Sequence, residues 1–68
     1  MNKFVFKSRH MDYKDQVVLE NNLEAAIEWV RQSNYLQEPF WEESEFVNKC
    51  RVCFTSEDAE DVAYDVSW

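Results

Sequence analysis

The chain has 68 residues, no glycine, 46% hydrophobic residues and a net charge of −7. A chain of this length forms one domain, residues 1–68, and its hydrophobic content is too high for a disordered protein. No apolar run approaches the ~20 residues that cross a bilayer, and the excess of acid disfavours direct binding to nucleic acid or to an anionic membrane. We therefore expect a small cytoplasmic protein whose partners are basic.

Residues 3–20 are predicted to form a β-hairpin, because apolar and polar side chains alternate in both halves. In the second strand of this hairpin, the odd-numbered positions form the apolar side, with Tyr13, Val17 and Leu19. Two registers fit this pattern. The favoured one places His10 opposite Asp15, and the other places Arg9 opposite Lys14.

Residues 21–34 change to a helical period. The apolar positions follow the spacing of one helix face and are Leu23, Ala26, Ile27 and Val30. Asn21 or Asn22 is suited to cap the N-terminus, and Glu28 precedes Arg31 by three residues, which predicts an ion pair on the outer surface.

The connection after the helix contains the single proline. Pro39 disfavours helix at the residue before it and is well suited to begin one, so we expect a single helical turn through residues 39–43. Residues 46–55 then alternate between apolar and polar positions, with Phe46 on the apolar face, and predict a third strand.

The C-terminal residues 56–68 fit two patterns, a helical face and a strand. The strand buries larger side chains and gives a consistent register, with Phe54 opposite Val62 and Arg51 opposite Asp65, which leaves residues 56–60 as the loop. The predicted fold is therefore a small α+β domain of ββαββ order, a four-stranded antiparallel sheet with one helix packed on one face.

Neither the two cysteines nor the single histidine forms a pattern typical of a catalytic or metal site. Cys50 and Cys53 lie three apart on a predicted strand and point to opposite faces, so we expect reduced thiols, Cys50 inside and Cys53 near the surface. A structural zinc site needs four ligands, and His10 would add only a third ligand to the two cysteines. We expect His10 to be a solvated turn residue. Without glycine, phosphate-cradling loops are excluded too. We predict no enzymatic activity, no metal and no cofactor.

Acid is concentrated after residue 20, where the chain holds eleven acidic and three basic side chains. Two stretches, 38–45 and 57–61, contain acids and no cation, whereas a solubilising surface mixes both signs. One stretch precedes the third predicted strand and the other follows it, so we expect them ~30 Å apart, a reach suited to a groove that holds a phosphate backbone. The acids concerned are Glu38, Glu42, Glu43, Glu45, Glu57, Asp58, Glu60 and Asp61.

In size, charge and α+β layout the chain resembles the small acidic inhibitors that bacteriophages use against host defence nucleases, including the anti-CRISPR and anti-restriction proteins. The resemblance implies a DNA-mimic-like inhibitor and assigns no site residue. Together with the acid clusters it predicts a non-enzymatic protein that occupies a basic, nucleic-acid-binding surface of a larger protein, with the eight acids as partner-binding residues.

Two other functions fit the same sequence. Phe40 and Trp41, with Tyr35, are suited to anchor a protein interface around which the acids form a steering rim, although such aromatics serve equally in core packing. A small homodimer formed through an edge strand is the third hypothesis, since open sheet edges invite pairing.

Overall fold

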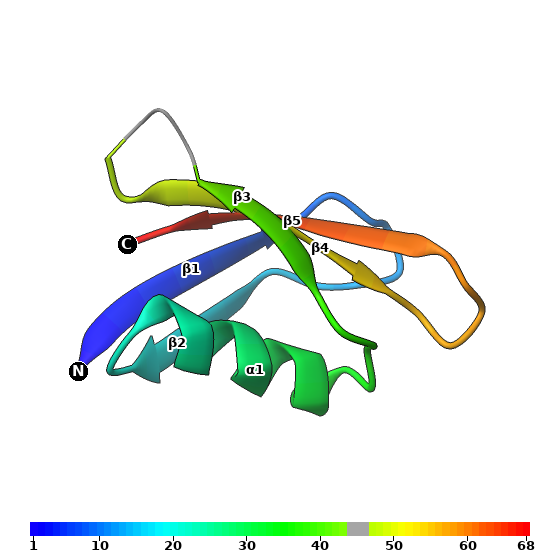
Figure 1. The fold of residues 1–68 in the computed structure, drawn as a ribbon, viewed down its shortest axis with the longest axis horizontal. Coiled ribbons are helices and arrows are strands. Elements are labelled where there is room, and N and C mark those ends of the chain that lie inside the picture. Colours follow the sequence, from blue (N-terminus) through cyan, green and yellow to red (C-terminus); the bar gives the residue numbers. More distant parts are fainter. Residues whose placement is uncertain (44–46) are drawn as a thin grey trace.

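The chain folds as a five-stranded antiparallel sheet with one α-helix packed against one of its faces (Figure 1). A computed structural model describes residues 1–43 and 47–68. The strand order across the sheet is β2-β1-β5-β4-β3. The elements are β1 (Asn2–Ser8), β2 (Gln16–Glu20), α1 (Leu23–Ser33), β3 (Phe40–Glu43), β4 (Lys49–Thr55) and β5 (Asp61–Ser67).

The predicted α+β fold is confirmed: the four expected strands lie in one antiparallel sheet, and the helix falls between the second and the third of them. The helical turn expected over residues 39–43 is wrong. Phe40–Glu43 form an additional strand, β3, which pairs with the outer edge of β4, so that Phe40 faces Cys53. The backbone hydrogen bonds to the unpaired edge of β4 outweigh the weak local preference for a single helical turn. Pro39 does not oppose this strand, because it precedes the strand and removes no hydrogen bond from the ladder.

The strand interpretation of the C-terminal residues is confirmed. β5 pairs with β4 in the predicted register, with Phe54 opposite Val62 and Arg51 opposite Asp65, and residues 56–60 form the loop. The helical alternative for this segment is wrong. This register aligns several apolar pairs and one ion pair at once. A shift of β5 along β4 would break all of them, so other registers are disfavoured.

Both registers considered for the first hairpin are wrong. The β1–β2 ladder ends at Phe6 opposite Gln16, because β1 continues beyond β2 and pairs with β5 up to Ser8. Residues 9–15 therefore form a longer connection. The inward side chain of β2 is Val18, whereas Val17 and Leu19 are each 59% exposed. Because Val17, Val18 and Leu19 are all apolar, the sequence pattern fits burial of either side of β2. Packing against the helix selects the side that carries Val18.

The helix begins and ends with identifiable caps. The side chain of Asn22 accepts a hydrogen bond from the Ala25 N–H at 2.8 Å, which settles the choice between the two asparagines. At the other end, Tyr35 has a left-handed backbone and the Leu36 N–H donates to the Arg31 carbonyl at 2.9 Å, as in a Schellman motif. The predicted Glu28–Arg31 ion pair is present and lowers the pKa of Glu28 to about 2.

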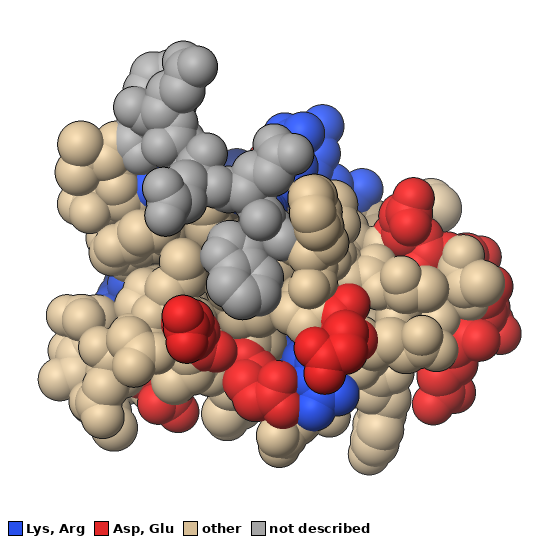
Figure 2. Space-filling view, in the orientation of Figure 1, with Lys and Arg blue, Asp and Glu red and all other residues tan. Residues whose placement is uncertain are grey.

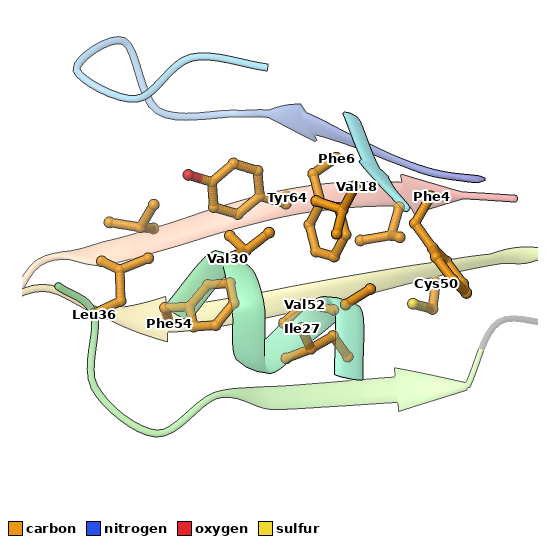
Figure 3. Packing of buried hydrophobic residues seen from close by; sticks show 13 residues of the cluster. Phe4, Phe6, Val18, Ile27, Val30, Leu36, Cys50, Val52, Phe54 and Tyr64 are labelled. Atoms are coloured by element: carbon orange, nitrogen blue, oxygen red, sulfur yellow. The ribbon is translucent and has the colours of Figure 1, made fainter. Parts of the chain in front are cut away.

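The core lies between the helix and the sheet (Figure 3). Every strand with described burial except β2 contributes two or three alternate side chains to it, and the helix contributes one face. The buried residues are Phe4, Phe6, Val18, Ala26, Ile27, Val30, Leu36, Cys50, Val52, Phe54, Val62, Tyr64 and Val66. Within residues 1–43 and 47–68, no helix covers the second face of the sheet.

Candidate binding site at the loop end

Three connections meet at one end of the molecule, on the right in Figure 1: residues 9–15, 34–39 and 56–60. We call this the loop end. The Gln37 N–H donates to the Thr55 carbonyl at 2.9 Å and so fixes the second connection beside the third. The His10 Nε2 and Glu60 Oε2 atoms lie 2.9 Å apart and join the first connection to the third. Segments distant in sequence are thus held in one site.

The loop of residues 56–60 has a defined shape. The Ser56 N–H donates to the Glu60 carbonyl at 2.9 Å, the Ala59 N–H donates to the Ser56 carbonyl at 3.0 Å, and Ala59 takes a left-handed backbone with φ of 62°. This is the three-residue hairpin loop in which glycine usually occupies the left-handed position. Ser56 is buried, and its Oγ accepts the Glu60 N–H at 3.1 Å. The carboxylates of Glu57 and Asp58 therefore project from a fixed tip.

A hollow of about 220 Å³ opens between these connections. Each connection supplies side chains to its wall, and together they comprise two phenol rings, two carboxylates, an amide and a hydroxyl. The lining residues are Tyr13, Asn34, Tyr35, Ser56, Glu57 and Asp58. Among the residues that the structure describes, no lysine or arginine lines it.

His10 supports the wall of this hollow and is not the solvated turn residue that the sequence predicted. Its side chain is only 18% exposed, and its ring packs edge-to-face on Tyr13 with centroids 5.2 Å apart. The Nδ1 atom accepts the Asp12 N–H at 3.1 Å, so Nε2 carries the ring proton and donates to Glu60. Both ring nitrogens are used, and Tyr13 is held in place.

Tyr64 adds an unusual polar atom close to this end. The residue is fully buried, and its hydroxyl has no hydrogen-bond partner among the described residues. Figure 3 shows the hydroxyl directed away from the other labelled core rings, toward the end of the sheet where β4 ends and Leu36 lies. Burial raises the pKa of Tyr64 to about 12, and the nearby Tyr13 and Asp15 contribute to the shift.

The predicted acidic residues are arranged differently from the expectation of two clusters ~30 Å apart. Because β3 folds back along β4, the first cluster begins at the loop end, where Glu38 follows the hydrogen-bonded Gln37. The second cluster lies in the adjacent loop. Five of the predicted partner-binding acids therefore share one end of the molecule: Glu38, Glu57, Asp58, Glu60 and Asp61.

The remaining predicted residues lie along β3 or beyond it. Backbone register places Glu42 opposite Arg51 and Glu43 opposite Cys50. The side chains of residues 41–43, and therefore the anchor role of Trp41, fall outside the described part of the structure. So do Glu45 and Phe46 as whole residues. Phe40 is described and is 67% exposed.

Basic residues gather on the open face of the sheet. Five of the seven lysines and arginines alternate with the buried residues of β1 and β4 or continue β1, and so point away from the helix: Lys3, Lys7, Arg9, Lys49 and Arg51. Asp65 bridges two of them, with contacts of 3.0 Å to Arg9 and to Arg51. Burial alone would raise the pKa of Asp65, but these hydrogen bonds outweigh it and hold that pKa below its ordinary value.

Figure 2 shows the resulting separation of charge. In this view acidic side chains cover the end that carries the β4–β5 loop and part of the helix side, whereas the basic side chains appear mainly at the rim, apart from one group at the lower centre. The structure thus has an acidic end and a more basic open face, a division that the sequence alone did not reveal because strands from both halves of the chain build that face.

Sequence reasoning identified the carboxylates of the site but not the residues that shape the hollow. Tyr13 was assigned to a strand, and Asn34 and Ser56 carried no signal, because only the packing of three connections brings them together. Tyr35, named among the aromatic anchors, does line the hollow and is 79% exposed.

The cysteines occupy the predicted positions, with Cys50 buried and Cys53 half-buried on the other face of β4. Burial raises the pKa of the Cys50 thiol. Among the side chains that the structure describes, no three His, Cys, Asp or Glu residues are grouped to hold a metal ion. Across residues 1–43 and 47–68, no helix has the length and apolar character needed to cross a membrane. Comparisons with protein-family models, with curated proteins and with solved structures found no match.

Proposed function

We propose that this protein is a non-enzymatic acidic binding protein that inhibits a larger protein by occupying its basic, nucleic-acid-binding surface. The observation that supports this proposal is the gathering of five carboxylates at the loop end while five of the seven cations lie on the open face. A molecule with such a charge distribution approaches a basic surface with its acidic end first.

The same arrangement suits competition with nucleic acid. Acids on a well-ordered backbone need little reorganisation when they replace phosphates, and the hydrogen bonds of the 56–60 loop supply that order. A nucleic-acid-binding target in the cytoplasm, such as a host nuclease confronted by a phage inhibitor, is the proposed setting.

A non-enzymatic role is the simpler account of the hollow. Among the described residues, the imidazole ring of His10 has no hydroxyl or thiol as a hydrogen-bond partner, and the Ser8 hydroxyl contacts only the His10 backbone, so the paired nucleophile and base of covalent catalysis are not assembled there. His10 instead uses both ring nitrogens to hold neighbouring connections together.

The proposal is tested by charge reversal. One variant carries Glu57→Lys and Asp58→Lys, and a second carries Glu42→Lys and Glu43→Lys. Each is immobilised and exposed to nucleic-acid-binding proteins, obtained from host lysate as the fraction retained on heparin. The parent should capture specific proteins that are released both by 0.5 M NaCl and by added DNA or RNA. Both folded variants should lose that capture.

An interface anchored by aromatic side chains is the second candidate, and the exposure of Phe40 supports it. In that case the captured proteins should remain bound at 0.5 M NaCl, should ignore added nucleic acid and should be lost on Phe40→Ala or Trp41→Ala. If both charge-reversed variants capture the same proteins as the parent, the inhibitor proposal fails and this second function replaces it.

A further inference from the structure

We propose that the hollow at the loop end is a binding site for a guanidinium group, which an arginine side chain of the partner protein supplies. This inference deepens the proposed function by naming the group that the acidic end recognises. It rests on that function only for the identity of the molecule that presents the arginine.

The walls of the hollow fit a planar cation. A guanidinium stacks on aromatic rings and donates paired hydrogen bonds to carboxylates, and the hollow offers both kinds of group. Tyr13 and Tyr35 enter from two different connections, and Glu57 and Asp58 enter from the third. A calcium or magnesium ion would instead need six or more oxygen ligands, and phenol rings do not supply them.

The two carboxylates of the hollow are free to accept a ligand. Among the described residues neither Glu57 nor Asp58 forms an ion pair or a side-chain hydrogen bond, whereas Glu60 contacts His10, and Asp65 bridges two arginines. The amide of Asn34 is already bonded to Gln16 and to the helix end, so it shapes the wall and does not compete for the cation.

The Tyr64 hydroxyl is a buried polar atom near the same end of the molecule, although Tyr64 is not among the residues that line the hollow. It lacks a hydrogen-bond partner among the described residues and is directed toward the end of the sheet where Leu36 lies. The hydroxyl is closed off from the surface, so the guanidinium site is inferred from the lining of the hollow.

Tyr35 is also retained where it is unfavourable for folding. It occupies the left-handed position that ends the helix, with φ of 56°, and its ring remains 79% exposed. Glycine or asparagine fits that position better. A ring in this place gains little from burial and is well placed to cover a ligand in the hollow.

The test is a titration of the ¹⁵N-labelled protein with an acetylated tri-arginine peptide, followed by amide chemical shifts. Matched peptides of tri-lysine and of tri-citrulline, which has nearly the same shape without charge, are the controls. We expect saturable shifts from tri-arginine at the lining residues, weaker binding of tri-lysine and no binding of tri-citrulline. Shifts spread evenly over all acidic residues, or equal affinity for tri-lysine, would overturn the proposal.

Two variants locate the site. Tyr35→Asn should weaken tri-arginine binding about three- to tenfold while leaving the fold intact, because asparagine accepts the left-handed backbone. Tyr35→Phe should bind like the parent. The double change Glu57→Gln with Asp58→Asn should weaken binding at least as much as Tyr35→Asn. Its matched control is Glu20→Gln with Glu24→Gln, which alters the net charge equally at the other end of the helix and should change affinity less than twofold.

Failure of this inference can be told apart from failure of the proposed function. Unchanged tri-arginine binding by the Tyr35→Asn and Glu57→Gln/Asp58→Asn variants removes the guanidinium site, whatever the capture experiment yields. Conversely, tri-arginine binding that maps to the hollow, combined with captured proteins that ignore nucleic acid, retains the site and rejects the nucleic-acid-binding target.

Discussion

Left-handed backbone in a chain without glycine is the most informative feature among single residues. Among the described residues Tyr35, Asn48 and Ala59 have φ of 56°, 62° and 62°. Asparagine tolerates this region, but a tyrosine or an alanine in it costs roughly 1 kcal/mol relative to glycine. The two costly positions both border the hollow of the loop end, one in the lining and one in the loop that carries the acids.

Ala59→Gly should therefore stabilise the protein. Glycine removes the steric cost of the left-handed position, and part of the gain is lost to the greater entropy of the unfolded chain. We expect the free energy of unfolding in urea to rise by about 0.5 kcal/mol. The control is Ala25→Gly inside the helix, which should lower it by ~1 kcal/mol. A destabilising effect at Ala59 would show that the loop does not depend on that backbone angle.

The buried hydroxyl of Tyr64 should make stability sensitive to alkaline pH. Its pKa is near 10 in the unfolded chain and about 12 in the folded protein, so between these values the folded state retains a proton that the unfolded state has lost. Stability is therefore fully present below pH 10 and falls as the pH rises toward 12. The Tyr64→Phe variant should lose less stability over this interval.

The measurement for Tyr64 is urea unfolding at pH 7, 10 and 11 on the parent and on Tyr64→Phe. At pH 7 the variant should match or exceed the parent by up to about 1 kcal/mol, because it removes a buried polar group without a described partner. The buried Cys50 thiol, whose pKa is also raised, lowers stability at alkaline pH as well, but it does so equally in the parent and in Tyr64→Phe. Equal losses in parent and variant would contradict the raised pKa of Tyr64.

At the level of helices and strands, the sequence predicts the pairing of those strands whose side chains match at several positions at once. The register of β4 and β5 follows from apolar pairs and the Arg51–Asp65 pair acting together. β3 could not be predicted, because four residues after a proline carry little periodicity and become a strand only beside β4. The prediction of which β2 side chains face the core was wrong for a related reason. Val17, Val18 and Leu19 are all apolar, and only packing against the helix selects Val18 as the buried residue.

The helix cap is the element feature most open to a direct test. The Asn22 side chain accepts from the Ala25 N–H, whereas among the described residues the Asn21 side chain forms no hydrogen bond and its carbonyl accepts from the Asn2 side chain. Asn22→Ala should lower the free energy of unfolding by about 1 kcal/mol, measured in urea, and Asn21→Ala should leave it within about 0.5 kcal/mol. Equal effects at both positions would argue against this cap.

The two edges of the sheet differ in a way that bears on the homodimer hypothesis. β3 and its flanks are rich in acid, and charged side chains at an edge discourage pairing with another chain. β2, at the opposite edge, presents the exposed Val17 and Leu19 and a row of backbone groups that pair with no second strand in the described sheet. If the chain associates with itself, β2 is the edge that the physical chemistry favours, and this association stays a prediction.

At the scale of the whole molecule, gathering carboxylates at one end opposes folding as well as favouring a basic partner. Like charges held close repel one another in the folded state, and the separation of the cations onto the open face leaves that repulsion poorly compensated. Binding sites commonly retain groups that are unfavourable for stability because a ligand requires them, and the site proposed at the loop end has this feature.

Neutralising the acids of the hollow should consequently stabilise the free protein. For Glu57→Gln with Asp58→Asn we expect the free energy of unfolding at pH 7 to rise by roughly 0.3–1 kcal/mol in 10 mM salt, where the Debye length is ~30 Å. The gain should shrink in 0.5 M NaCl, because salt already screens the repulsion.

The control for that experiment is Glu20→Gln with Glu24→Gln, which removes the same charge at the other end. Glu24 lies in the first helical turn, where a carboxylate is favoured by the helix dipole, so this control should leave stability unchanged or slightly reduced. If both double variants stabilise equally, the repulsion belongs to the net charge of −7 and not to the loop end. If the Glu57/Asp58 variant is less stable than the parent at low salt, these carboxylates support the fold, and their exposure at the hollow no longer argues for a ligand.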